Sequence, residues 1–197
     1  GAGALEAYAE VIGIARETGC ALHLAHATLN FPSNAGAAPR FLEMVDQALA
    51  DGVDITMDSY PYLPGATTLV ALLPSWIAAG GVDALRDRLA AGRDRDALVR
   101  ALDVDGCDGF HGERADWSRI QISGVGDPAL RALVGRTIAD IAQETGEAPV
   151  DAVIRILLAD DLATGVLMHI GHEENVQAIM RHPVHTGGSD GILVGDR

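Results

Sequence analysis

Short apolar segments alternate with helical segments along this chain, and this alternation is the feature that most constrains its fold. Strands are predicted where short apolar runs are bounded by loops, at residues 20–26, 53–58, 118–124, 165–170 and 184–191. Helices are predicted where apolar residues recur at helical spacing, at 4–18, 39–51, 81–103, 137–146, 149–161 and 173–181. Strands joined by helices through short connections predict an α/β fold in which all five strands form one parallel sheet.

Two architectures satisfy this pattern, an open doubly wound sheet and part of a (β/α)₈ barrel. A complete barrel has eight strands and typically about 250 residues, which exceeds the 197 residues of this chain. Neither a glycine-rich dinucleotide fingerprint nor a phosphate-binding loop follows a predicted strand. The nucleotide-binding form of the open sheet therefore loses support. The Pro- and Gly-rich stretch at 59–81 is predicted to be a loop packed over the fold.

Composition excludes several classes of partner. The formal net charge is −14, and the basic side chains are all arginine. Such an acidic chain argues against binding to nucleic acid or to an anionic membrane surface. No apolar run is long enough to span a bilayer, and two cysteines do not make a disulfide framework, so we expect a reduced cytoplasmic protein. The oligomeric state is left open.

Polar side chains stand at the predicted C-terminal ends of the strands, where both architectures place functional groups. These residues are His26, Asp58, Tyr60, Ser123, His169 and Asp190. Histidine and aspartate at separate strand ends suit zinc, and a carboxylate beside a metal-bound water can serve as general base. His26 and Asp190 each have an equally weighted structural interpretation, His26 as an ordinary strand-end histidine and Asp190 as a turn aspartate between glycines.

Other candidates are weaker on the sequence alone. Tyr60 and Tyr62 flank a proline and would line a pocket with apolar rings and hydroxyl tips, although loop packing explains them equally well. The remaining histidines are predicted to have structural or surface roles; they are His23, His111, His172, His182 and His185.

Several motifs together resemble the second half of the N-acyl-D-amino-acid deacylases, or D-aminoacylases, of the metal-dependent amidohydrolase superfamily. The resemblance rests on "LHLAHATLN", "GVDITMDSYPYLPGATTL", "LVGRTIADIAQETGEAPVDAVIRILLAD", "GHEENVQAIMRHP" and "GGSDG", in this order. It implies that residues 1–197 are a fragment of one TIM-like catalytic barrel, supplying strands five to eight. It also implies a helical insertion at 74–117 between strands six and seven.

The resemblance further implies an activity and a set of site residues. The activity is hydrolysis of N-acyl-D-amino acids by water activated on one or two zinc ions. His26 corresponds to a zinc ligand, and Asp190 to the metal-site aspartate that passes a proton from the water to the leaving amine. Ser123 falls near the substrate carboxylate, and Arg197 is the nearest candidate for a downstream arginine that grips this carboxylate. The glycines around Asp190 would allow backbone and carboxylate to approach metal and substrate closely.

Two departures from the family pattern leave alternatives open. The family carries a second zinc-binding histidine at the end of strand six, where this chain reads "MDSYPY", so Asp58 or Tyr60 would have to serve. The family's H-x-H motif and metal-binding cysteine do not occur in these 197 residues. A dihydroorotase-like or hydantoinase-like enzyme for cyclic amides and a non-catalytic remnant therefore stay as alternatives, and the fragment alone is expected to be inactive.

Overall fold

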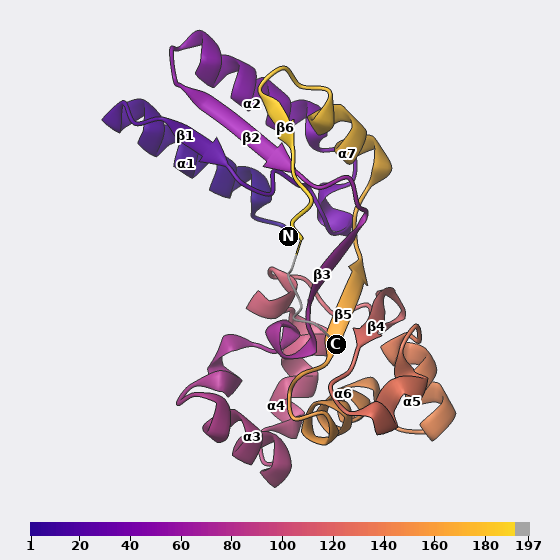
Figure 1. Cartoon of the computed structure of the whole chain (residues 1–197). Helices are drawn as coiled ribbons and strands as arrows, with labels where there is room; N and C mark the ends of the chain where they lie inside the picture. The colour runs from indigo at the N-terminus through magenta and orange to yellow at the C-terminus, as the bar shows by residue number, and fades with distance from the viewer. Residues whose placement is uncertain (192–197) are drawn as a thin grey trace. The chain divides into compact units, whose positions relative to one another are not determined.

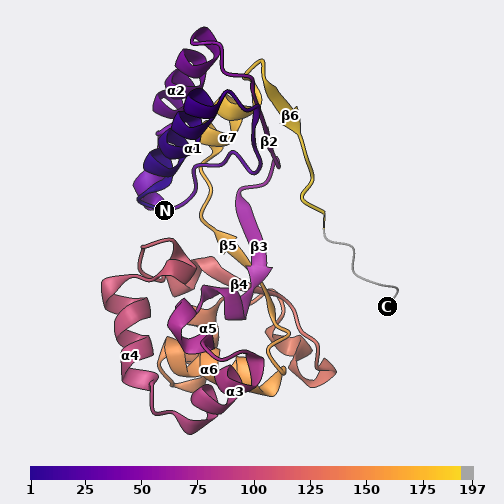
Figure 2. The ribbon, with the colours of Figure 1, turned by 90° about the vertical axis from the view of Figure 1, so that its left-hand side faces the viewer.

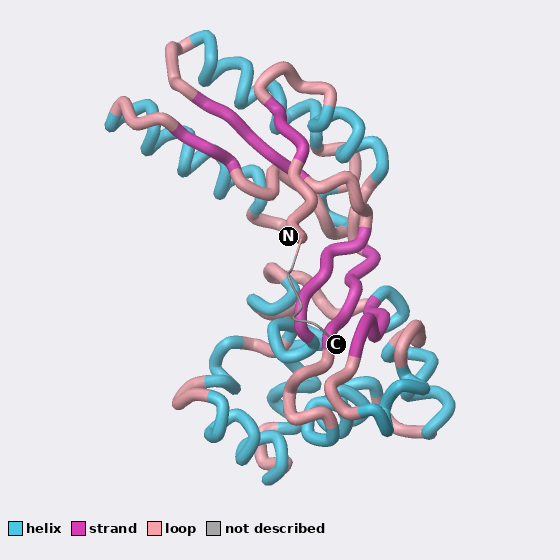
Figure 3. Tube along the Cα trace, viewed as in Figure 1, coloured by secondary structure: helices cyan, strands magenta, loops and turns pink. Residues whose placement is uncertain are grey.

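The computed structural model describes residues 1–191, and the chain divides into two compact units. The first unit comprises Gly1–Leu63 and the chain from Gly171 onward, and the second comprises Pro64–Ile170. Each unit contains its own three-stranded sheet, drawn in magenta in Figure 3. Residues 74–117 lie within the second unit, and their role as an insertion between two barrel strands stays a prediction.

The first unit is built on a parallel sheet with the strand order β1–β2–β6, as Figure 1 shows. The strands are β1 (Leu22–Leu24), β2 (Ile55–Ser59) and β6 (His185–Gly187). Helices α1 (Ala4–Thr18), α2 (Ala38–Ala50) and α7 (Glu173–Met180) lie on one side of this sheet (Figure 2). Strands that are distant in sequence are neighbours in this sheet, because β6 pairs directly with β2.

The helices form where the sequence places apolar residues on one face. In α2, Phe41, Val45 and Ala48 are fully buried at spacings of four and three residues. Gly19 ends α1 in the left-handed conformation, with φ of 69°, a geometry that glycine adopts without a steric penalty. Burying a side chain such as that of Phe41 contributes roughly 1.5–3 kcal/mol, so this helix face carries much of the stability of the unit.

The two faces of the parallel sheet differ in chemistry. Leu24, Ile55 and Met57 are buried in the hydrophobic core that the helices share. His23 and Thr56, which are opposite each other in the register, project from the other face and are exposed. The period of two along each strand therefore gives one apolar face and one polar face. The predicted site residues His26 and Asp58 lie near the C-terminal ends of β1 and β2.

The second unit contains an antiparallel sheet with the strand order β3–β5–β4. Its strands are β3 (Pro64–Thr68), β4 (Ile120–Gly124) and β5 (Gly165–His169). The prediction that the segments at 118–124 and 165–170 join one parallel sheet is therefore wrong. Within residues 1–191 the strands form two separate sheets, and neither sheet closes into a barrel. The identity of the strands as barrel strands five to eight stays a prediction.

Helices pack around the antiparallel sheet. They are α3 (Val82–Ala91), α4 (Arg95–Val99), α5 (Ile138–Thr145) and α6 (Pro149–Ala159), together with a π-helical segment at Arg100–Asp105. Short 3₁₀ helices occur in this unit at Leu69–Leu72, Ser75–Ala78, Asp108–Phe110, Trp117–Arg119 and Pro128–Leu133, and in the first unit at Pro32–Asn34. Thr137 caps α5 by accepting a hydrogen bond from the N–H of Asp140 at 3.1 Å. Among the described residues, no helix combines the length and the apolar character needed to cross a membrane.

Candidate active site

His26 stands in a sharp bend just after β1. Its φ of 52° places it in the left-handed region, which costs a non-glycine residue on the order of 1–2 kcal/mol. Neighbouring strand β2 holds this bend: the N–H of His26 donates to Oδ1 of Asp58 at 2.9 Å. The next N–H, that of Ala27, donates to the backbone carbonyl of Asp58 at 2.7 Å. Two successive N–H groups are therefore fixed by one residue at the end of β2.

Asp190 follows β6 on the other side of β2. The backbone hydrogen bonds continue one residue past β6, because the N–H of Gly188 donates to the carbonyl of Ser59 at 3.1 Å. Asp190 itself has a φ of 49°, whereas the nearby Gly188 and Gly191 are not among the glycines with positive φ. The unusual backbone conformation thus lies at the aspartate, and the glycines' role in close approach to metal and substrate stays a prediction.

The two predicted site residues meet in the structure. Nε2 of His26 lies 3.2 Å from Oδ1 of Asp190, and the two side chains are 58% and 52% exposed. Ligand bonds of about 2.0–2.1 Å in a tetrahedral zinc site put neighbouring ligand atoms about 3.3 Å apart. The pair therefore fits as two ligands of one ion, although a direct hydrogen bond explains the distance as well. Within residues 1–191, no group of three or more His, Cys, Asp or Glu side chains gathers closely enough to hold a metal.

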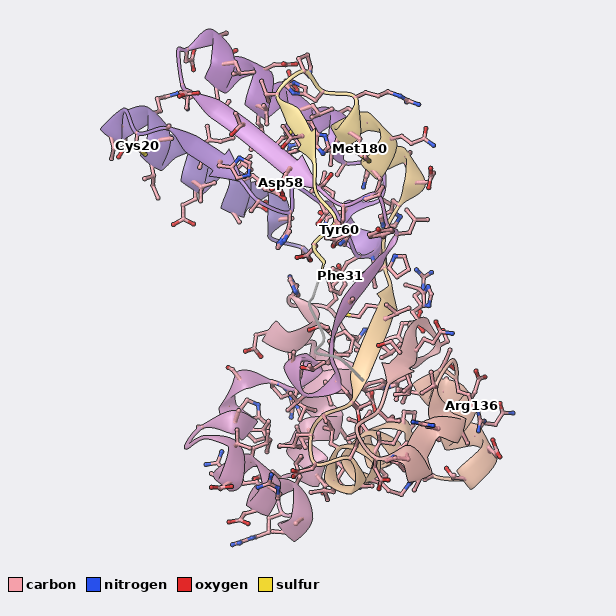
Figure 4. The ribbon with its side chains drawn as sticks, viewed as in Figure 1. Cys20, Phe31, Asp58, Tyr60, Arg136 and Met180 are labelled. Carbon is pink, nitrogen blue, oxygen red and sulfur yellow. The ribbon has the colours of Figure 1, made fainter. Side chains whose placement is uncertain are left out.

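Asp58 lies at the end of β2, labelled in Figure 4, and both of its carboxylate oxygens are engaged. Oδ1 accepts the N–H of His26, and Oδ2 lies 3.1 Å from Nε2 of His23. Nδ1 of His23 lies 2.7 Å from Oγ1 of Thr56. The backbone hydrogen bond from His26, followed by the side-chain hydrogen bond from His23, holds the pKa of Asp58 below its usual value. The carboxylate is therefore kept as an anion between two histidine residues.

The two tyrosines of the "YPY" segment stack beside His26. The ring centroids of Tyr60 and Tyr62 are 6.2 Å apart with an interplanar angle of 18°. The centroid of Tyr60 lies 6.1 Å from that of the His26 imidazole, and Tyr62 is 54% exposed. Tyr60 is labelled beyond the end of β2 in Figure 4. These rings supply an apolar wall next to the His26–Asp190 pair.

Two other predicted residues, Ser123 and His169, belong to the second unit. Ser123 is exposed on β4 of the second unit, and its contact with the substrate carboxylate stays a prediction. His169 ends β5 in the same unit, where its Nε2 lies 3.0 Å from Oε1 of Gln121. Arg197 lies outside the described residues.

His23 has a partner that sequence reasoning did not identify. The predicted structural or surface role is consistent with its exposed ring, which contacts the Asp58 carboxylate. The signal was present in the alternation of "LHL", which turns a histidine outward between two apolar residues of a strand. Two other histidines of the first unit have different partners. Nε2 of His185 lies 2.8 Å from Oγ of Ser59, and Nε2 of His182 lies 3.0 Å from Oδ1 of Asp46. Within the described chain, neither of these partners is hydrogen-bonded to His26.

Comparison with known proteins gives one curated relative and several solved structures. No family model matches the chain. A 61-residue stretch, 31% of this chain, is 43% identical to N-acyl-D-glutamate deacylase of Alcaligenes xylosoxydans xylosoxydans and covers 12% of that protein. The crystal structure of N-acyl-D-glutamate deacylase from Bordetella bronchiseptica aligns with 96% of this chain at a TM-score of 0.63 and 25% identity. That structure is described as complexed with zinc and a phosphonate inhibitor that mimics the tetrahedral intermediate of the reaction.

A crystal structure of D-aminoacylase aligns with 96% of this chain at a TM-score of 0.59 and 23% identity, which supports the fold. The chain covers 30% of the length of each of these two solved proteins. Fold and alignments together show a mixed α/β segment that aligns with part of these proteins. More specifically, the chain is homologous to N-acyl-D-glutamate deacylase and D-aminoacylase, and it corresponds to part of those proteins. The resemblance inferred from the sequence motifs is thereby confirmed.

Proposed function

We propose that this chain forms part of the active site of a zinc-dependent amidohydrolase that cleaves the amide bond of N-acyl-D-amino acids. The observation that carries the proposal is the 3.2 Å contact between His26 and Asp190, two side chains that leave different strands of one parallel sheet. Homology to N-acyl-D-glutamate deacylase makes an acylated D-amino acid the first substrate class to test.

The residues of this chain have distinct roles in the proposal. His26 and Asp190 would hold zinc through the imidazole and the carboxylate. Zinc, when bound, polarises the amide carbonyl and lowers the pKa of water so that it attacks at neutral pH. Asp190 accepts the proton that this water releases, and it then donates the proton to the amide nitrogen as the C–N bond breaks. The proton is thus carried from the nucleophile to the leaving group by a single carboxylate.

The surrounding residues orient the substrate. The stacked rings of Tyr60 and Tyr62 form an apolar surface against which the acyl group packs. Ser123 is proposed to hydrogen-bond the substrate carboxylate, and Arg197 to pair with it. Completion of a tetrahedral zinc site requires ligands in addition to His26 and Asp190, because structural and catalytic zinc sites use at least three protein ligands.

Two alternatives remain. A cyclic-amide hydrolase would use the same aspartate as a proton carrier, so the test includes dihydroorotate and a hydantoin as substrates. A non-catalytic homologue is favoured by one observation, the lack of a third ligand near the His26–Asp190 pair among residues 1–191.

The deciding experiment uses the gene product at its natural length. Zinc content and hydrolysis of N-acetyl-D-glutamate and other N-acetyl-D-amino acids are measured for the unaltered protein and for Asp190→Asn. We expect the variant to keep its zinc and to lose at least about 100-fold in kcat, the usual contribution of a general acid–base group. Asp161→Asn is the matched control, since Asp161 shares the left-handed backbone, with φ of 49°, but pairs with Arg86 in the second unit. A metal-free protein that is inert towards all of these substrates would refute the proposal.

A further inference from the structure

We infer that Asp58 is a positioning residue for His26: its carboxylate holds the His26 backbone in the left-handed conformation that brings Nε2 to Asp190. This inference rests on the proposed function for its consequence in zinc binding. The placement of His26 by Asp58 is itself testable without any metal.

The bend at His26 needs support from outside β1. A non-glycine residue with a φ of 52° persists only where surrounding contacts determine it. Asp58 supplies two such contacts, through Oδ1 to the His26 N–H at 2.9 Å and through its carbonyl to the Ala27 N–H at 2.7 Å. The N–H of Thr28 then folds back to the carbonyl of His26 at 2.6 Å, which closes the turn.

The carboxylate that carries out this role is itself held in place. Its second oxygen contacts Nε2 of His23, whose Nδ1 is fixed by the hydroxyl of Thr56. His23 and Thr56 face each other in the β1–β2 register, so the three side chains form one row on the polar face of the sheet. Because both oxygens of Asp58 already have partners, the structure gives this residue a different role from that of a metal ligand.

Asp58 also lies beside the segment that leads to Asp190. It is opposite Thr186 in the β2–β6 register, and a Cβ added to Gly188 would lie 4.0 Å from its Cγ. The end of β2 is thus the common neighbour of both chain segments that supply the candidate ligands. Displacing this carboxylate would alter the His26 side of the His26–Asp190 pair first, since of these two residues it is His26 whose N–H donates to the carboxylate.

Two substitutions separate hydrogen-bond geometry from charge. Asp58→Asn removes the charge but keeps an oxygen at the Oδ1 position, and its amide can donate to His23 in the other imidazole tautomer. Asp58→Glu keeps the charge but moves the carboxylate by one methylene. Asp54→Asn is the control, because Asp54 is exposed just before β2 and, within residues 1–191, its side chain has no hydrogen bond or ion pair.

The measurements are amide hydrogen exchange at His26 and Ala27 in the metal-free chain, and zinc affinity by titration. We expect Asp58→Asn and the control to keep the slow exchange of the unaltered chain. Asp58→Glu should speed exchange at His26 and weaken zinc binding by about 10-fold, the lower end of the effect seen for residues that orient metal ligands.

Each outcome decides the inference. Retained protection and affinity in Asp58→Glu, or their loss in Asp58→Asn, would overturn it, since charge or a general structural role would then be responsible. If the gene product at its natural length binds no zinc while exchange at His26 still follows the expected pattern, the positioning role stands and the zinc-dependent function fails. Far-ultraviolet circular dichroism of every variant verifies that exchange reports the bend and not global unfolding.

Discussion

Asn175 on α7 accepts the backbone N–H of Ala38, the first residue of α2, through its Oδ1 at a distance of 3.1 Å. Its Nδ2 donates to the carbonyls of Leu29 at 3.0 Å and Asn34 at 2.7 Å. Asn175 is 1% exposed, so all three backbone partners are satisfied by one buried side chain. This amide ties the segment after residue 170 to the loop that follows His26, and it thereby joins the two parts of chain that make up the first unit.

Replacing this amide should destabilise the first unit. We expect Asn175→Ala to lower the free energy of unfolding by about 3 kcal/mol, because each buried backbone group left without a partner costs about 1–3 kcal/mol. Urea denaturation followed by circular dichroism measures the change. Gln177→Ala, on the exposed side of the same helix, removes only exposed side-chain hydrogen bonds with Glu173 and Arg181 and should cost less than about 0.5 kcal/mol. Equal losses in the two variants would contradict the role assigned to Asn175.

Tyr8 anchors the loop after His26 from α1 and should respond to alkaline pH. Its hydroxyl donates to the carbonyl of Thr28 at 3.1 Å, and its ring packs on Phe41 with centroids 4.4 Å apart. Burial raises the pKa of Tyr8 to about 12. Because the folded protein holds this proton more tightly than the unfolded chain, the stabilisation is complete below pH 10 and is lost as the pH rises through 12.

Ultraviolet absorbance during a pH titration tests this expectation. The latest of the tyrosine ionisations should disappear in Tyr8→Phe and persist in Tyr62→Phe, whose ring is exposed. Tyr8→Phe should also cost about 1 kcal/mol of stability near neutral pH, the net value of one hydrogen bond. An unchanged titration curve in Tyr8→Phe would show that the hydroxyl is not buried as described.

The elements of the first unit were predictable because local periodicity and burial agree there. The helix expected at 39–51 forms at Ala38–Ala50 with Phe41 and Val45 in the core. In the second unit β3 was missed, since Pro64–Thr68 reads "PGATT" and has neither strong strand propensity nor apolar alternation. Its pairing with β5 supplies the order that the local sequence lacks. Strand direction was also misjudged, because the pattern of a buried strand does not record the direction of its neighbours.

The sequence predicted the two central residues of the candidate site but not the hydrogen bonds that hold them. A position at the end of a strand identified His26 and Asp190, and the structure brings them together. The relation between Asp58 and His26 depends on a hydrogen bond between residues 32 positions apart, and only the strand register reveals it. The sequence predicts no more than a structural or surface role for His23, because a single outward-facing histidine gives no sign of its partner on the adjacent strand.

The ion pair between Arg95 and Asp151 should make the second unit sensitive to acid. Nε and Nη2 of Arg95 on α4 donate to the two carboxylate oxygens of Asp151 on α6, at 2.6 and 2.7 Å. These hydrogen bonds lower the pKa of Asp151 below its ordinary value of 3.8. The stabilisation is therefore present above pH 3.8 and is lost as the pH falls through the lower folded-state pKa.

Arg95→Met tests this pair in urea denaturation from pH 7 to pH 3. We expect a small decrease in the urea midpoint at pH 7, because the pair is only half-buried, and a smaller difference from the unaltered chain at the acidic end. Arg93→Met is the control, because within the described chain no hydrogen bond or ion pair involves the Arg93 side chain. A deficit that stays constant from pH 7 to pH 3 would assign the effect to lost packing of the arginine stem.

Zinc binding by the 197-residue chain alone should be weak. Among the described residues no group of three or more His, Cys, Asp or Glu side chains could hold a metal, and the His26–Asp190 pair alone does not complete a tetrahedral site. We expect a dissociation constant on the order of micromolar or weaker, and His26→Ala should weaken binding further by at least about 10-fold. Isothermal titration with zinc measures both values, with His169→Ala as the control, since His169 contacts Gln121 in the second unit. Tight stoichiometric binding together with turnover of an N-acyl-D-amino acid would contradict this expectation. These 197 residues would then hold a complete site, with further zinc ligands besides His26 and Asp190.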